Sequence, residues 1–268
     1  MNGNVNGLYG GIVDQSLSGI DNGIGYGIAS GLYVDTNIGS IIGNRLVLNL
    51  DASSRLSYIG TGTLWNDLSG RRNNGILTNG AIFDTVNGDS ILFDGSNDRV
   101  SINTSTSLDI QSTITLEILM RPNINNQNGG VLGKWTTGAG SDNSYLFFLG
   151  QDVNNNRYGF SIYQSNNSLR SLFPTTTFNA NQWYHIVCVA NGSIMNIYNN
   201  GVIDSSSLSY DGTIKTSTKN VMVGTLRQED NLYPFNGRIA LAKIYNRALS
   251  QSEINFNYTI LKTKYQLT

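Results

Sequence analysis

The segment "SILFDGSNDRVSI", residues 90–102, carries the clearest fold signal in the chain. Ile91 and Phe93 occupy alternate positions, as the side chains on one face of a β-strand do. An Asp-Gly step then turns the chain, and Val100 and Ile102 restart the same alternation. The segment therefore predicts two short consecutive strands joined by a turn, each with one buried face.

The same pattern of short apolar segments separated by turn residues extends through most of the sequence. Roughly ten segments have strand length, are rich in Val, Ile, Tyr or Phe, and are flanked by Gly, Asn, Asp or Ser. Many short strands at regular spacing predict an all-β sandwich. The step Asn200-Gly201 in "IYNNGVID" also predicts a tight hairpin turn. The segments are residues 45–52, 90–102, 112–122, 129–135, 144–151, 157–164, 182–192, 193–203, 220–226 and 235–249.

Composition narrows the class of protein. The chain has 268 residues, 17 basic and 18 acidic side chains, and a formal net charge of -1, so it lacks the basic surface that nucleic acids or anionic lipids require. Cys188 is a single cysteine in an apolar run and is expected to be a small buried hydrophobe. No apolar run approaches the length of a membrane span, and the N-terminus lacks a conventional signal-peptide pattern. We expect a soluble protein that does not use the standard secretion route.

One helix is predicted, near the C-terminus. In "ALSQSEINFNYTILKTK", Ser250 is followed three residues later by Glu253, which is the pattern of a capping box. Ile254, Tyr258 and Leu261 then recur on one helical face. This short helix should pack against the sandwich.

Residues 1–45 differ from the rest of the chain. The stretch "GLYGGIVDQSLSGIDNGIGYGIASGLYVDTN" scatters single apolar residues among glycines, without a helical or strand period. A flexible linker is one interpretation. The recurring large apolar residues favour another, an arm that anchors the protein to an assembly or to other copies of itself. The candidate arm residues are Leu8, Tyr9, Ile12, Leu32 and Tyr33.

From about Leu46 to Tyr265 the chain resembles the concanavalin A-like, laminin G-type jelly-roll family, in the form common on bacteriophage structural proteins and bacterial surface proteins. The resemblance rests on several pieces in the expected order: "LVLNLDASSRLSYIGTGTLWNDLSGRRNNGILTNG", "ILFDGSNDRVSI", "TITLEILMRP", "WYHIVCVANGSIMNIYNNGVI" and "FNGRIALAKIYNRALSQSEINFNY". It implies an all-β, concanavalin A-like jelly-roll sandwich over residues 46–268, with a short C-terminal helix and a Gly-rich N-terminal arm over residues 1–45.

The resemblance also interprets the segment "WNDLSGRRNNGILTNGAIF". In similar domains it is a long connection across the edge of the sandwich, so Trp65 and Leu68 would anchor it. Residues 73–75 would make the turn. Arg71 and Arg72 would then face solvent, either as a solubilising pair or as a contact to a glycan carboxylate or a partner.

Some members of this family bind calcium at the sandwich rim. Asp94, Asn97 and Asp98 are the candidate ligands here, with Asp142 and Asn143 as further oxygen donors. The same residue types also make Asx turns, which is the alternative interpretation. Zinc is not expected, because the chain has one histidine and one cysteine.

Catalysis is not expected. A glycosidase needs two suitably spaced carboxylates, and the three glutamates lie in a strand (Glu117), a loop (Glu229) and the capping box (Glu253). The single histidine, His185, lies within a predicted strand, where similar domains often place one. We therefore predict that the protein is not an enzyme.

Sugar binding is the sharper hypothesis. Lectin sites combine an aromatic face with Asn, Asp and backbone amides on loops. Two segments offer these groups, although Trp135 could instead belong to the core. The candidate glycan-binding residues are Trp135, Asp142 and Asn143 in "GKWTTGAGSDNSY", and Asp230, Asn231 and Tyr233 in "RQEDNLYPF".

The resemblance and the arm together predict a bacteriophage virion structural protein, such as a head fibre, capsid decoration or tail-associated protein. Its partners would be capsid or other virion proteins, further copies of itself, and host-surface glycans bound weakly and with avidity. Nucleic acid and membrane are not expected as partners, and the expected location is the virion. The alternative is a carbohydrate-binding module on a bacterial surface or outside the cell.

Overall fold

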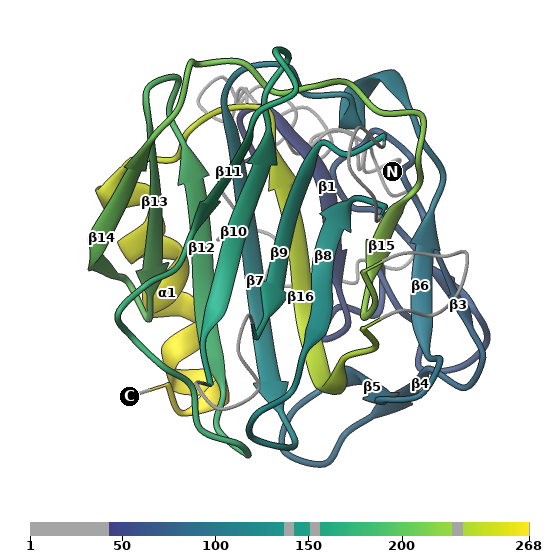
Figure 1. The fold of residues 1–268 in the computed structure, drawn as a ribbon. Coiled ribbons are helices and arrows are strands. Elements are labelled where there is room, and N and C mark those ends of the chain that lie inside the picture. The colour runs from purple at the N-terminus through teal and green to yellow at the C-terminus, as the bar shows by residue number, and fades with distance from the viewer. Residues whose placement is uncertain (1–42, 137–141, 151–155, 227–232, 268) are drawn as a thin grey trace, which may run out of the picture. The chain divides into compact units, whose positions relative to one another are not determined.

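A computed structural model describes residues 43–136, 142–150, 156–226 and 233–267. These residues form two antiparallel sheets of eight strands each, packed face to face around a shared hydrophobic core (Figure 1). The prediction of an all-β sandwich is confirmed.

The first sheet contains the longest strands. In spatial order its members are β14 (Val202–Ser209), β13 (Ile194–Asn199), β12 (Tyr184–Ala190), β7 (Ile114–Pro122), β16 (Asn236–Tyr245), β5 (Ser90–Asp94) and β4 (Ile82–Asp84). β1 (Leu46–Asp51) pairs with the second half of β16, while β5 pairs with its first half.

The second sheet closes the other side of the core. In spatial order its members are β11 (Leu169–Leu172), β10 (Tyr158–Tyr163), β9 (Tyr145–Leu149), β8 (Gly129–Lys134), β15 (Val221–Val223), β6 (Arg99–Ile102), β3 (Gly75–Thr78) and β2 (Leu64–Trp65). A short 3-10 helix, η2 (Thr106–Leu108), lies between β6 and β7 in the chain.

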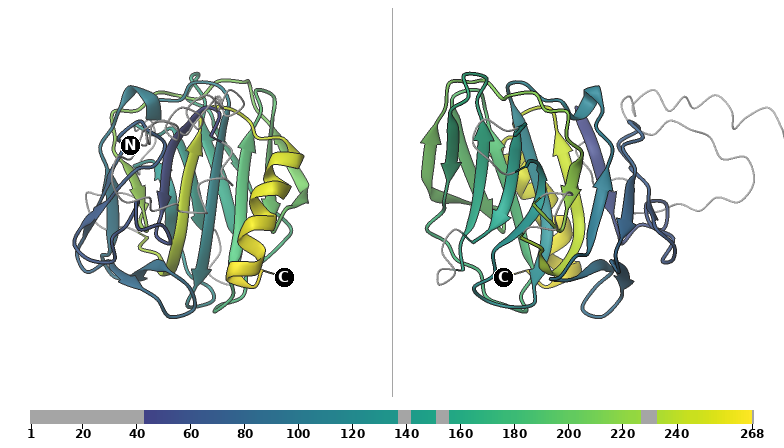
Figure 2. Two further views of the ribbon diagram at one scale, coloured as in Figure 1. Left: turned by 180° about the vertical axis from the view of Figure 1, so that it is seen from behind. Right: turned by 45° about the vertical axis from the view of Figure 1, so that its right-hand side comes forward.

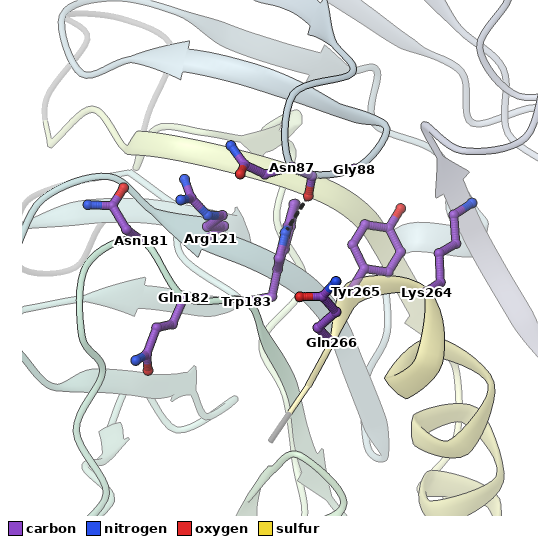
Figure 3. Close-up of a pocket in the computed structure, with 9 residues that line it drawn as sticks. All are labelled: Asn87, Gly88, Arg121, Asn181, Gln182, Trp183, Lys264, Tyr265 and Gln266. Carbon is purple, nitrogen blue, oxygen red and sulfur yellow. Dashed lines mark hydrogen bonds between the residues drawn. The ribbon is translucent and has the colours of Figure 1, made fainter.

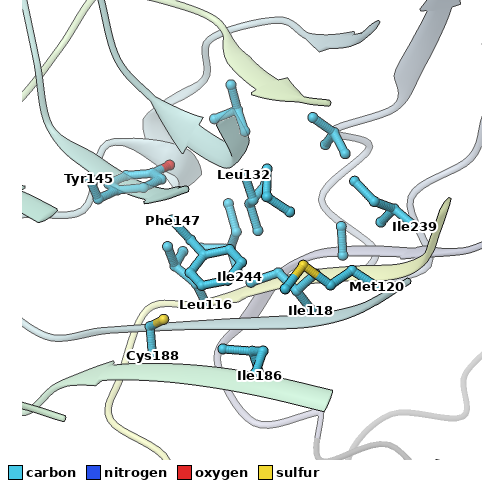
Figure 4. Close-up of a cluster of buried hydrophobic side chains, with 14 of the residues drawn as sticks. Leu116, Ile118, Met120, Leu132, Tyr145, Phe147, Ile186, Cys188, Ile239 and Ile244 are labelled. Atoms are coloured by element: carbon cyan, nitrogen blue, oxygen red, sulfur yellow. The ribbon is translucent and has the colours of Figure 1, made fainter. Parts of the chain in front are cut away.

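The core forms because side chains alternate across each strand. In β7, Leu116, Ile118 and Met120 face the second sheet and meet Phe147 of β9 (Figure 4). Cys188 lies in the same cluster and is fully buried, as predicted, and burial raises the pKa of its thiol. Since alternate residues of β7 fill the core, the remaining ones must point out of the sandwich.

Local turn predictions are also confirmed. β5 and β6 occupy the two halves of residues 90–102, and Ile91 and Phe93 are fully buried. The β13–β14 hairpin turns at Asn200 and Gly201, whose φ angles of 50° and 80° are the positive values that Asn-Gly turns adopt.

The segment that follows β1 was only partly predicted. It is not a single long connection, because it contains β2, β3 and β4. Trp65 is fully buried, and Arg71 and Arg72 are exposed, as expected. The predicted turn at residues 73–75 is wrong, because the positive φ angles are at Gly70 and Arg72.

Asn73 and Gly75 have structural roles instead. The Asn73 side chain is buried and donates a hydrogen bond of 2.7 Å to the carbonyl oxygen of Val47. Gly75 begins β3 so close to Val100 that an added Cβ would lie 2.6 Å from its side chain. The physical reason for the error is that a glycine can mark close packing as well as a turn.

The predicted C-terminal helix is confirmed as α1 (Gln251–Tyr265). Ser250 and Glu253 form the capping box, and Glu253 also pairs with Arg247 at 2.7 Å. α1 lies against the outer face of the first sheet, on the side away from the second sheet (Figure 2). Among the described residues, no helix is long and apolar enough to cross a bilayer.

A buried polar cluster joins α1 to this sheet. Glu117 of β7 is fully buried and lies 2.9 Å from Nε2 of His185 on β12. Lys243 lies 3.6 Å from the other carboxylate oxygen, which also accepts hydrogen bonds of 3.0 Å from Tyr245 and from Asn257 of α1. Burial alone would raise the pKa of Glu117, but Lys243 and His185 outweigh it and hold it at about 2. The predicted structural role of His185 is therefore supported by its contacts.

Candidate functional site

The outward side chains of two neighbouring strands begin the candidate site. In β7, the positions of Glu117 and Arg121 face away from the core, on the side that carries α1. β12 runs antiparallel to β7, and its first residue, Tyr184, lies opposite Met120. Trp183, which comes just before β12, is therefore next to Arg121 near the end of β7. Alternation and register thus bring a guanidinium and an indole together.

Two more segments complete a pocket around these side chains. The connection between β4 and β5 supplies Asn87 and Gly88, and the C-terminal end of α1 supplies residues 264–266. The pocket has a volume of about 490 Å³, within the usual range for ligand sites. Figure 3 shows Trp183 and Tyr265 between Arg121 on one side and Lys264 on the other. The amide side chains at its wall are those of Asn87, Asn181, Gln182 and Gln266.

The aromatic pair in this pocket is held in a fixed orientation. Nε1 of Trp183 donates a hydrogen bond of 2.7 Å to the carbonyl oxygen of Asn87 (Figure 3). The rings of Trp183 and Tyr265 pack edge to face, with their centroids 4.9 Å apart and an angle of 66° between their planes. The Tyr265 hydroxyl donates a hydrogen bond of 3.1 Å to the carbonyl oxygen of Asp89. Because the indole N–H is bound to the protein, the aromatic face is the part of Trp183 left for a ligand.

Gly88 makes this arrangement possible. Its φ angle of 110° is unfavourable for residues with a side chain, and an added Cβ would lie 2.8 Å from Cε1 of Tyr265. The glycine therefore lets the β4–β5 connection approach the ring closely enough to form one wall of the pocket.

The charged residues in the pocket wall are both cations. The half-buried Arg121 makes no hydrogen bond or salt bridge to a described residue, since neighbouring Asp84 pairs with Arg238 at 2.6 Å. Desolvation, and then the charge of Arg238, lower the pKa of Arg121. Nζ of Lys264 lies 5.6 Å from the centre of the Tyr265 ring. Among the residues that the structure describes, no Asp or Glu side chain belongs to the wall.

The predicted glycan residues near the end of β8 do come together, but the side-chain oxygens of Asp142 and Asn143 accept hydrogen bonds from within the protein. Trp135 is half-buried and meets Tyr163 edge to face at 5.7 Å. Asn143 accepts a hydrogen bond of 2.7 Å from the backbone N–H of Thr136. Asp142 accepts from both the backbone and the hydroxyl of Thr218. Although burial opposes it, these hydrogen bonds lower the pKa of Asp142.

The second predicted glycan segment lies elsewhere. Tyr233 is 38% exposed, and its carbonyl oxygen accepts from the N–H of Gly130 at the start of β8. Trp135 follows the other end of that strand, about 17 Å away at the usual rise of an extended chain. Asp230 and Asn231 lie outside the described residues, as do the arm residues Leu8, Tyr9, Ile12, Leu32 and Tyr33.

The predicted calcium ligands take part in turn contacts. Asp94 accepts a hydrogen bond of 2.7 Å from the N–H of Ser96, which is an Asx turn. Asp98 accepts one of 2.9 Å from the N–H of Asp94, and burial raises the pKa of Asp98. The backbone carbonyl of Asn97 accepts from the side chain of Asn79. In the part of the chain that the structure describes, no three His, Cys, Asp or Glu residues are grouped for a metal ion, so calcium binding stays a prediction.

The pocket residues were missed at the level of sequence. Arg121 and Trp183 lie at the ends of predicted strands, and alternation from the core residues marks both as outward-facing. That signal exists in the sequence. Their proximity depends on the pairing of β7 with β12 and on the position of α1, which no local pattern specifies.

Comparisons with known proteins agree with this fold. The family model described as the concanavalin A-like lectin/glucanases superfamily matches residues 94–255. A search of curated proteins found no match.

Solved structures show the same architecture at low sequence identity. The binding domain of Paraclostridial Mosquitocidal Protein 1 matches with a TM-score of 0.62 and 19% identity, over 81% of this chain and 52% of that one. The binding domain of Botulinum Neurotoxin DC in complex with SialylT matches with a TM-score of 0.60 and 16% identity, over 82% and 52%. The botulinum neurotoxin serotype D ligand binding domain in complex with N-Acetylneuraminic acid matches with a TM-score of 0.60 and 16% identity, over 81% and 51%. This chain thus spans about half the length of these structures. On the family match and the two-sheet architecture, the chain belongs to the concanavalin A-like lectin/glucanases superfamily.

Proposed function

We propose that this domain binds carbohydrate in the pocket formed by β7, β12, α1 and the β4–β5 connection. The observation that carries the proposal is the fixed aromatic face of Trp183 inside a pocket walled by amide side chains. An aromatic face suits the C–H surface of a sugar ring, and amides suit its hydroxyl groups. The hydrogen bond of Trp183 to Asn87 and its contact with Tyr265 hold the indole in place before a ligand binds.

The comparisons support a binding role. The superfamily includes lectins, and two of the similar structures are toxin binding domains in complex with SialylT or N-Acetylneuraminic acid. We propose that this chain binds without catalysing a reaction. Two of its glutamates are engaged in structural contacts: Glu117 lies under α1, and Glu253 pairs with Arg247.

Replacing Trp183 with alanine should weaken glycan binding about 30-fold, because removal of an aromatic anchor from a pocket typically costs about 2 kcal/mol or more. Binding would be measured by calorimetry with the best ligand from a panel of neutral and acidic oligosaccharides. Trp135→Ala is the matched control, and it removes the tryptophan of the other predicted glycan segment. Loss of binding in Trp135→Ala with full binding in Trp183→Ala would move the site to the end of β8.

For the whole chain we propose a bacteriophage virion structural role, as a head fibre, capsid decoration or tail-associated protein located on the virion. Residues 1–45 would be the anchoring or oligomerising arm, and the jelly roll would be displayed outward to bind host-surface glycans with avidity. The recurring Leu, Ile and Tyr residues of the arm support this assignment. A surface-bound or extracellular bacterial carbohydrate-binding module is the alternative.

Light scattering tests the arm directly. We expect the full chain to be a defined oligomer and a truncation beginning at Leu46 to be a folded monomer, because the apolar residues of the arm would be buried between copies. If both proteins are monomers, self-assembly through the arm is wrong. The arm would then be an anchor to a different partner or a linker in a free binding module.

A further inference from the structure

Arg121 places a positive charge in the wall of the pocket. Arg121 is half-buried, yet its guanidinium makes no hydrogen bond or salt bridge with a described residue. Partial burial of an arginine is normally accompanied by a partner, because its five N–H donors lose water when they are enclosed. A guanidinium at a pocket wall that makes no direct contact with a partner in the described part of the chain can donate these hydrogen bonds to a ligand.

Asp84, a carboxylate near Arg121, already pairs with Arg238. Asp84 contacts Nε and Nη2 of Arg238 at 2.7 and 2.6 Å, and Arg238 also donates to Asn123 at 2.8 Å. β16 places Arg238 opposite Arg121, so two guanidinium groups share a neighbourhood with this one carboxylate. Asp84 therefore makes its direct contacts with Arg238, and it acts on Arg121 only through its charge, which opposes the lowering of the pKa of Arg121.

The rest of the described pocket wall supplies no negatively charged partner for Arg121. Lys264 adds a second cation beside Tyr265, and no acidic side chain from the described part of the chain lines the pocket. Burial, and after it the charges of Asp51 and Asp89, raise the pKa of Tyr265, but neither aspartate belongs to the wall. The pocket consequently favours negative charge.

We infer that the pocket selects sugars that carry an oxyanion, and that Arg121 binds this group while Trp183 holds the ring beside it. The planar fork of an arginine fits the oxygens of a carboxylate, sulfate or phosphate with paired hydrogen bonds. Asn181 and Gln182 stand at the same wall for the hydroxyl groups. This inference rests on the proposed carbohydrate-binding function and specifies its ligand class.

Pairs of glycans that differ in the acidic group test the inference. We would compare oligogalacturonate with its methyl ester, sialyllactose with lactose, and sulfated dextran with dextran, by calorimetry on the full chain. At least one acidic member should bind about 10- to 100-fold more tightly than its neutral counterpart, as expected for charge-assisted hydrogen bonds. The pair that shows the preference identifies the anion as carboxylate or sulfate.

Variants assign the preference to Arg121. Arg121→Gln should remove it, and Arg121→Lys should restore only part of it, because lysine keeps the charge but lacks the fork. Arg170→Gln is the matched control, since it removes the same charge from an exposed arginine on β11 of the second sheet, outside the pocket. Thermal unfolding of each variant would confirm that the fold is retained. An Arg121→Gln variant that keeps the full preference overturns the inference.

The outcomes separate the two proposals. Equal binding of acidic and neutral members, abolished by Trp183→Ala, would overturn the anionic ligand class and leave carbohydrate binding in place. Acidic preference lost equally in Arg170→Gln and Arg121→Gln would also overturn it, because the effect would then come from net charge. Absence of binding to every member of the panel would overturn both proposals.

Discussion

Replacing Glu117 with alanine is expected to lower the free energy of unfolding by about 3–5 kcal/mol, as measured by chemical denaturation, because removing one partner of a buried ion pair leaves the other charge uncompensated. Lys243, His185 and Asn257 all contact this carboxylate, and all lie beneath or within α1. The variant would therefore loosen the attachment of the helix to the first sheet.

Glu253→Ala is the matched control for this prediction. Glu253 is partly exposed and pairs with Arg247, so its loss should cost about 1 kcal/mol, the usual value of a helix cap. The pKa of Glu117 is held at about 2 against an ordinary value of 4.5, so its contribution is present above pH 4.5 and is lost as the pH falls through about 2. The difference between wild type and Glu117→Ala should shrink over that window. Equal costs for the two alanine variants at neutral pH would contradict the structural role of the cluster.

Trp65→Ala should destabilise the protein by about 3–5 kcal/mol, because it removes a large aromatic side chain from the core and leaves a cavity. Trp65 is fully buried at the end of β2 and packs in the main hydrophobic cluster. Denaturant titration with fluorescence and circular dichroism would measure the change.

Trp65→Phe provides the comparison for that variant. It keeps an aromatic ring and removes an indole N–H that has no hydrogen-bond partner among the described residues, so it should cost less than about 1.5 kcal/mol. A small effect of Trp65→Ala, similar to that of Trp65→Phe, would show that this segment is a surface connection instead of part of the core.

The length of a strand decides whether it can be predicted from the sequence. Strands such as β7 and β12 were predicted because their alternation or apolar content runs over many residues. β2, β3, β4 and β11 were missed because each has only two to four residues, too few for a period to stand out. Their pairing with longer neighbours, which is a tertiary effect, makes them strands.

The candidate site is harder to predict from the sequence than the short strands are. The sequence points to Trp135, Asp142 and Asn143 because they share one polar loop, and the structure places the side-chain oxygens of Asp142 and Asn143 in internal hydrogen bonds. Arg121 and Trp183 are distant in the chain and lie in strand-like segments, so nothing local marks them as neighbours. Strand register joins them, and the end of α1 closes the pocket around them.

The three tryptophans of the chain provide the most direct test of the proposed site. An NMR spectrum of the indole N–H groups, assigned with single Trp→Phe variants, would be recorded during titration with the best-binding glycan of the panel. The Trp183 signal should shift, because its ring would contact the sugar, while the signal of the buried Trp65 should stay in place. A shift of Trp135 alone, or binding that leaves all three signals unchanged, would contradict the assignment of glycan binding to this pocket.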